Sequence, residues 1–155
     1  MKPFSIVEHR KGQELTYDLI GYFSENATLP ALVQPVIKIN LSQIVGINSY
    51  GIRGWCRWLT SIPKDTKVIL LECPFCVVKS FNSVFGMLNQ QIEVHSFYVP
   101  YYDDDSGVGQ KVLYKKDKNY SGLTVTHPIV TDAKNKALAM DVTDSYFDFL
   151  KLTKS

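Results

Sequence analysis

Residues 36–55 constrain the fold of this 155-residue chain more than any other segment. The stretch 36–41 is apolar apart from Lys38 and Asn40, a pattern typical of a strand that is covered on both faces. A polar turn at 48–51 follows, and an amphipathic helix is predicted after it. In an open α/β sheet, ligands and partners bind beyond the carboxyl ends of the strands, where the amides of helix N-termini are exposed. We therefore expect any functional site at this turn.

The surrounding sequence predicts an α/β fold: a mixed β-sheet with packed helices. We expect strands at 4–7, 15–22, 36–41, 67–71 and 92–99, a helical or turn segment at 26–32, and helices at 51–62 and 74–88. The first two strands form a hairpin, and right-handed crossovers place the helices on the sheet. The apolar stripe of the first helix comprises Ile52, Trp55, Cys56, Leu59 and Ile62. The stripe of the second comprises Val77, Phe81, Val84 and Leu88, flanked by Val78 and Phe85.

The chain changes character after Tyr102, because a polar turn at 103–109 is followed only by short apolar runs. These runs predict one or two small hairpins. Residues 143–150 predict a short capped helix that docks onto the main sheet through Tyr146, Phe147, Phe149 and Leu150. We therefore expect a main domain at 1–100 and a C-terminal β-hairpin extension at 101–155.

Charge and hydropathy limit the classes of partner. The 17 basic and 15 acidic residues are interspersed, which does not favour binding to nucleic acid or to an anionic membrane. The sequence has no secretory core and no run of about 20 apolar residues, so we expect a cytoplasmic protein without membrane insertion. A protein partner or a small ligand is the expected class.

The run Ile-Asn-Leu-Ser-x-Ile-x-x-Ile-Asn-Ser-Tyr-Gly-Ile, at 39–52, resembles the signature of the STAS domain, which sulfate transporters and anti-sigma factor antagonists share. The resemblance implies a sheet with helices on one side and a turn that binds a partner kinase. Asn48 occupies the position of the family's aspartate, Ser49 that of its first serine, Tyr50 that of the phosphorylated serine and Gly51 that of the glycine. Because Tyr50 replaces the serine, the resemblance implies partner binding without the serine switch.

Two segments of the tail resemble a zinc ribbon that has lost its cysteines. They are Tyr101-Tyr102 and the run at 126–130, Thr-His-Pro-Ile-Val. A structural zinc site needs four ligands, usually thiolates or imidazoles, and His127 is the only tail residue of either type. The sequence therefore predicts a metal-free extension.

Cys73 and Cys76 form a Cys-x-x-Cys motif between a predicted strand and a predicted helix. A helix N-terminus lowers the pKa of a thiol, so a thiol-disulfide oxidoreductase is an alternative function. The segment between this motif and Pro100 is too short for the usual chain path of such enzymes. We expect these cysteines to be structural.

These patterns favour a non-enzymatic, STAS-like interaction module of bacterial signalling, without cofactor, metal or catalytic residue. The expected partner is a kinase, an anti-sigma factor or a similar regulator, and a homodimeric scaffold is a third hypothesis. Trp55 and Trp58 fit core and boundary packing, and a half-exposed Trp58 beside Arg57 has the composition of an interface anchor. The predicted partner-binding residues are Asn48, Ser49, Tyr50, Gly51, Arg53, Arg57 and Trp58.

Overall fold

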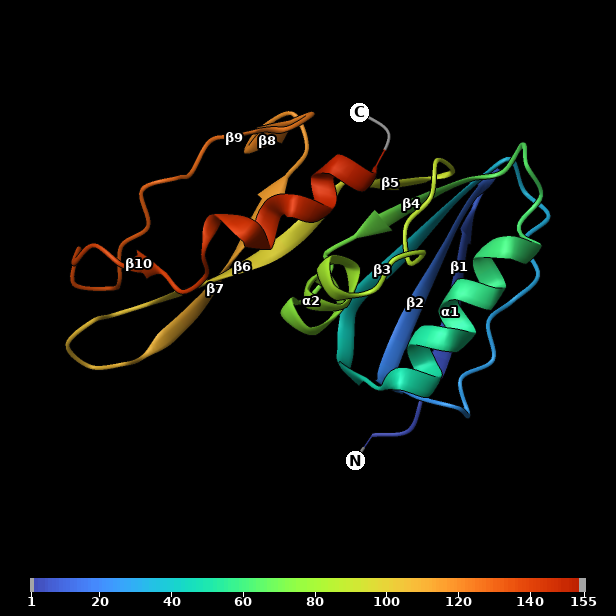
Figure 1. The fold of residues 1–155 in the computed structure, drawn as a ribbon, viewed down its shortest axis with the longest axis horizontal. Coiled ribbons are helices and arrows are strands. Elements are labelled where there is room, and N and C mark those ends of the chain that lie inside the picture. Colours follow the sequence, from blue (N-terminus) through green and yellow to red (C-terminus); the bar gives the residue numbers. More distant parts are fainter. Residues whose placement is uncertain (1, 154–155) are drawn as a thin grey trace.

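The computed structural model describes residues 2–153, and its centre is a mixed five-stranded sheet in the order β1-β2-β3-β4-β5 (Figure 1). A three-stranded sheet, β10-β6-β7, and a two-stranded sheet, β8-β9, are formed by the C-terminal third of the chain. The strands of the large sheet are β1 (Ser5–Lys11), β2 (Glu14–Phe23), β3 (Val36–Ile47), β4 (Lys67–Leu71) and β5 (Ile92–Val94). The helices are α1 (Ser49–Ser61), α2 (Phe75–Ser83) and the 3₁₀ helix η1 (Asp144–Leu152).

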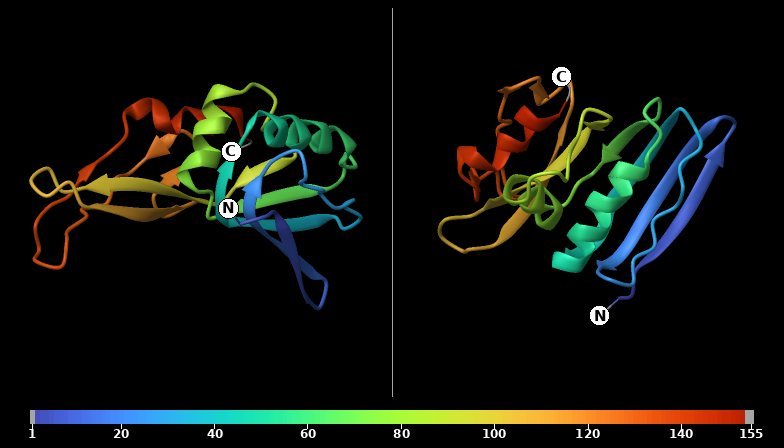
Figure 2. Two further views of the ribbon diagram at one scale, coloured as in Figure 1. Left: turned by 90° about the horizontal axis from the view of Figure 1, so that it is seen from below. Right: turned by 45° about the vertical axis from the view of Figure 1, so that its right-hand side comes forward.

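The strand directions follow from the connections. β1 and β2 form the predicted hairpin, which turns at Gly12 with a positive φ of 61°. β2, β3, β4 and β5 are parallel to one another, and α1 and α2 supply the crossovers from β3 to β4 and from β4 to β5. Successive right-handed crossovers in one direction leave both helices on the same face of the sheet, as Figure 2 shows.

Alternation along the strands separates a core face from an open face. Ile37 and Ile39 of β3 and Val68 and Leu70 of β4 are fully or almost fully buried in the cluster under the helices. Lys38, between the two isoleucines, bonds to Glu14 of β2 on the opposite face. The open face of the large sheet therefore carries this ion pair, and it also carries Ile69 of β4, which alternates with Val68 and Leu70.

The predicted second helix is too long. α2 ends at Ser83, and Gly86 follows with a positive φ of 98° that a helix does not allow. Phe85, expected beside the apolar stripe, is 95% exposed.

The segment 26–32, expected to be helical or a turn, contains no helix and belongs to an irregular loop at 24–35.

The predicted strand 92–99 is two strands. β5 ends at Val94 and pairs with β4, whereas β6 (Ser96–Tyr102) pairs with β7 (Gly109–Lys115) and β10 (Ala139–Met140) in the second sheet. The chain thus leaves the large sheet at His95, and residue 100 lies inside β6. The remaining strands, β8 (Tyr120–Ser121) and β9 (Thr124–Val125), form a small hairpin.

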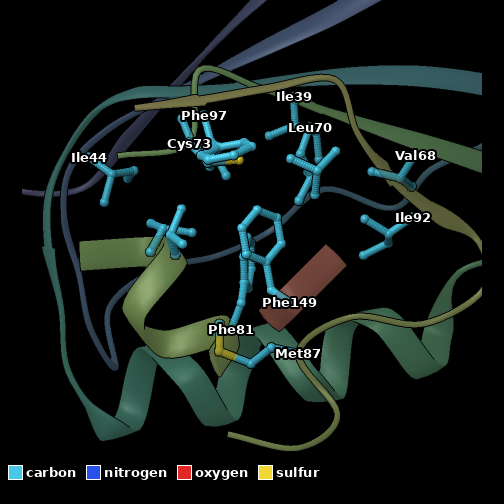
Figure 3. Packing of buried hydrophobic residues seen from close by; sticks show 14 of the residues in the cluster. Ile39, Ile44, Val68, Leu70, Cys73, Phe81, Met87, Ile92, Phe97 and Phe149 are labelled. Atoms are coloured by element: carbon cyan, nitrogen blue, oxygen red, sulfur yellow. The ribbon is translucent and has the colours of Figure 1, made fainter. Parts of the chain in front are cut away.

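One hydrophobic cluster connects the parts. Phe149 of η1 packs against Phe81 of α2 and Phe97 of β6, with ring centroids 6.0 Å and 5.0 Å apart respectively (Figure 3). The four η1 residues expected to dock the C-terminal helix, Tyr146, Phe147, Phe149 and Leu150, are all buried. Within residues 2–153, no helix is long and apolar enough to cross a membrane.

Candidate functional site

Two residues of the predicted turn fix the start of α1. The Asn48 side chain caps the helix by accepting a 2.9 Å hydrogen bond from the Gly51 amide, and the Asn48 amide donates to the carbonyl oxygen of Phe23. A Cβ atom on Gly51 would lie 2.2 Å from that same carbonyl oxygen. Gly51 is buried for this reason, and the N-terminus of α1 is packed against the end of β2.

The outward side of α1 carries an aromatic ring and two positive charges. Tyr50 is 57% exposed, and the Arg53 guanidinium lies 5.8 Å from the centroid of its ring, within cation–π range. Ser49, Arg53 and Arg57 are also exposed. Neither arginine forms a salt bridge with any residue in the described range 2–153.

Trp58 is not the half-exposed anchor that the helix periodicity predicted. Its side chain is buried, and its indole N–H donates a 2.7 Å hydrogen bond to the carbonyl oxygen of Pro30. The loop at 24–35 covers it, an arrangement that periodicity within a helix cannot reveal. Trp55 makes the equivalent bond, also 2.7 Å, to the carbonyl oxygen of Met87.

The two indole hydrogen bonds fix two loops beside α1. The loop at 24–35 runs along one side of the helix, and the loop at 84–91 lies on the other (Figures 1 and 2). Each presents an apolar side chain to solvent: Val33 is 86% exposed and Phe85 is 95% exposed. We call Val33, Tyr50, Arg53, Arg57 and Phe85 together the α1 surface.

The sequence did not predict the exposure of Val33 and Phe85, and it placed Phe85 beside the apolar stripe of the second helix. Val33 lies between Pro30 and Pro35, and Phe85 precedes Gly86. Proline and glycine are turn signals, and an apolar residue beside them is less securely assigned to the core. These signals could have identified both residues as loop positions.

The cysteine motif is buried at Cys73 and partly buried at Cys76, whereas a reactive dithiol is accessible to solvent and has a lowered pKa. Cys73 is fully buried where β4 meets β6; its amide donates to the Ser96 carbonyl oxygen and its own carbonyl accepts from the Tyr98 amide. Burial raises the pKa of both Cys73 and Cys76. α2 begins only at Phe75, so Cys73 lies outside the helix.

The tail segments compared with a zinc ribbon are linked by hydrogen bonds. The Tyr101 and Tyr114 hydroxyls are 2.5 Å apart, and the Tyr114 hydroxyl is 2.8 Å from Nδ1 of His127. Burial, with the neighbouring Tyr101 hydroxyl, raises the pKa of Tyr114. Among residues 2–153, no group of three or more histidine, cysteine, aspartate or glutamate side chains is placed to hold a metal ion.

A pocket of about 690 Å³, with several charged residues in its lining, lies where the two main sheets meet. At its base, Glu93 is 2.9 Å from Nζ of Lys67, 2.9 Å from Nε2 of His95 and 3.8 Å from Nζ of Lys116. Glu72, with a positive φ of 52°, accepts hydrogen bonds from Asn40 and from the Tyr98 hydroxyl. These charged groups satisfy one another and join β4, β5 and the end of β7.

No known family model matches the chain, and neither the curated proteins nor the solved structures include a significant match.

Proposed function

We propose that this chain is a non-enzymatic protein-interaction module of bacterial signalling, similar to the anti-sigma factor antagonists. It binds a kinase or an anti-sigma-like regulator through the 48–53 turn and the outward side of α1. One observation carries the proposal: Tyr50, Arg53 and Arg57 project from a helix whose start is fixed by Asn48 and Gly51. Tyrosine and arginine are enriched among the residues that dominate interface energies.

The environment of Tyr50 supports binding without a serine switch. The STAS resemblance assigns Tyr50 to the phosphorylated position, where its exposed phenol replaces the hydroxyl of the serine. A kinase specific for serine at that position would find no substrate there. The interaction is therefore independent of serine phosphorylation at this position.

Two other functions receive less support. Oxidoreductase activity needs an accessible thiolate, whereas burial raises the pKa of both thiols in the motif. For a homodimeric scaffold, light scattering of the purified protein measures the molecular mass and so tests directly whether a dimer forms. A dimer that forms through α1 would exclude the proposed partner.

The test begins with quantitative capture of partners from the native cell on the wild-type protein. Replacing both Tyr50 and Arg53 with alanine removes exposed groups, so the melting temperature is unchanged, while binding of the captured regulator weakens about tenfold or more. The matched control is the double variant Lys118→Ala/Leu123→Ala, which removes one exposed charge and one exposed apolar side chain from the C-terminal extension. Equal binding by all three proteins would refute the proposed site.

A further inference from the structure

We infer that the α1 surface binds an acidic amphipathic segment of the partner protein. Carboxylates of the segment pair with Arg53 and Arg57, and its apolar side chains pack on Phe85, Val33 and Tyr50. The inference rests on the proposed function and specifies the chemistry of the partner.

The charge distribution carries the first step. α1 contains Arg53 and Arg57 and no acidic residue, the loop at 84–91 has no charged residue, and the loop at 24–35 has only Glu25. Elsewhere in the described chain, some exposed lysines pair with carboxylates, as Lys38 does with Glu14 and Lys136 with Asp103, and others, such as Lys64 and Lys118, form no ion pair. The two arginines, one helical turn apart, repel each other and have no such partner within residues 2–153. A negatively charged ligand relieves this repulsion.

The exposed apolar side chains carry the second step. Phe85 and Val33 are almost entirely exposed to water, and each lies in a loop that is hydrogen-bonded to α1. Aromatic residues, phenylalanine included, are enriched in protein–protein interfaces, because their burial there removes a large apolar area from water. The ligand must therefore have apolar as well as acidic groups, which describes an amphipathic peptide segment.

The third step is the fixed position of the flanking loops. The hydrogen bonds from Trp55 to Met87 and from Trp58 to Pro30 hold these loops to the helix before a ligand arrives. Pre-organisation lowers the entropic cost of binding. A second copy of the chain fits less well, because a two-fold interface centred on α1 would gather four arginines, and α1 has no acidic residue to pair with them.

The experiment uses three synthetic peptides and the isotope-labelled full chain. The first peptide has apolar residues at helical spacing with glutamates between them, the second has lysines in place of the glutamates, and the third keeps the glutamates but has serines in place of the apolar residues. Amide spectra identify where each peptide binds. We expect the first peptide alone to shift the signals of α1 and of residues 85–87.

Charge exchange provides the stringent control. The double variant Arg53→Glu/Arg57→Glu should bind the glutamate peptide at least tenfold more weakly and should gain binding to the lysine peptide. Phe85→Ser should weaken binding of the glutamate peptide without affecting the fold, because Phe85 is 95% exposed. Binding of the lysine peptide to the wild-type protein with equal affinity, or no shift at α1 with any peptide, would overturn the inference. Preferential binding to phosphatidylglycerol vesicles would also overturn it, since a membrane would then be the ligand.

The captured regulator separates failure of the inference from failure of the proposed function. If the Tyr50→Ala/Arg53→Ala variant loses the regulator but Arg57→Glu and Phe85→Ser retain it, the site stands and the acidic segment is excluded. If the Tyr50→Ala/Arg53→Ala variant retains the regulator, the proposed function itself fails.

Discussion

At the scale of single residues, the burial of a side chain depends on the segments that cover it as well as on its position in its own helix. Trp55 was expected in the core and Trp58 at its edge, yet both are buried and both donate an indole hydrogen bond to a loop carbonyl. Helical spacing gives the direction of a side chain but carries no information about a loop that folds over it. For that reason Trp58 could not be assigned correctly from the sequence, whereas the exposure of Tyr50, Arg53 and Arg57 agrees with their positions off the apolar stripe.

Thiol reactivity gives a prediction at this scale. At pH 8 a disulfide reagent should modify Cys73 of the folded protein much more slowly than Cys73 of the protein unfolded in urea, because burial raises the pKa of this thiol and removes its access to solvent. Peptide mapping by mass spectrometry measures the rates at each cysteine. The partly exposed Cys56 is the internal control and should react faster than Cys73. Fast labelling of Cys73 in the folded state would restore the oxidoreductase alternative.

At the scale of elements, hydrophobic patterns predicted the existence of strands and helices better than their ends or partners. The predicted strand 67–71 coincides with β4, and the predicted helix 51–62 matches α1 to within two residues at its start and one at its end. The second helix was extended too far because Leu88 continues the apolar spacing of Val77 and Phe81, although the backbone has already turned at Gly86. Between β5 and β6 the alternation shifts by one position, from Ile92 and Val94 to Phe97 and Val99, but this shift alone does not reveal that the pairing partner changes there.

Two glycines of α1 give a matched pair of predictions. Gly51→Ala places a Cβ atom against the Phe23 carbonyl and should lower the free energy of unfolding by about 1–3 kcal/mol. Gly54→Ala meets no atom within 4 Å and should raise it by up to about 1 kcal/mol, because alanine has the higher helix propensity. Urea unfolding curves measure both values. Equal effects of the two substitutions would show that α1 does not begin against β2 as described.

At the scale of the whole molecule, charged groups as well as the core connect the large sheet to the C-terminal third. Glu93 of β5 contacts Lys67 of β4, His95 between the sheets and Lys116 after β7. Partial burial raises the pKa of Glu93, but its bonds to Lys67 and His95 and the charge of Lys116 outweigh this effect and lower the pKa from 4.5 to about 2. The domain division expected at residue 100 would cut through β6, and the contacts of Glu93 with His95 and Lys116 follow from no pattern in the sequence.

This linkage predicts a pH dependence. Because the pKa of Glu93 is lower in the folded state, its contribution to stability is present above pH 4.5 and is lost as the pH falls from 4.5 toward 2. Glu93→Gln should therefore lower the melting temperature at pH 7 and flatten its fall in acid. The control Asp148→Asn removes an exposed carboxylate 3.3 Å from Lys151 and should change little. An unchanged acid profile for Glu93→Gln would exclude Glu93 as a main contributor.

The aromatic cluster predicts that the chain unfolds as one unit. Phe149 is fully buried, and its ring touches Phe81 under the large sheet and Phe97 of the second sheet. Phe149→Ala should thus lower the free energy of unfolding by about 3–5 kcal/mol through the cavity that it leaves. Hydrogen exchange should show protection falling together at Ile39 in β3 and at Tyr114 in β7, since both belong to the same buried cluster. The exposed Leu152, at the end of the same helix, supplies the control, and Leu152→Ala should have little effect. Loss of protection in β7 alone would mean that residues after 100 fold independently of the large sheet, and that a partner bound at α1 cannot stabilise them.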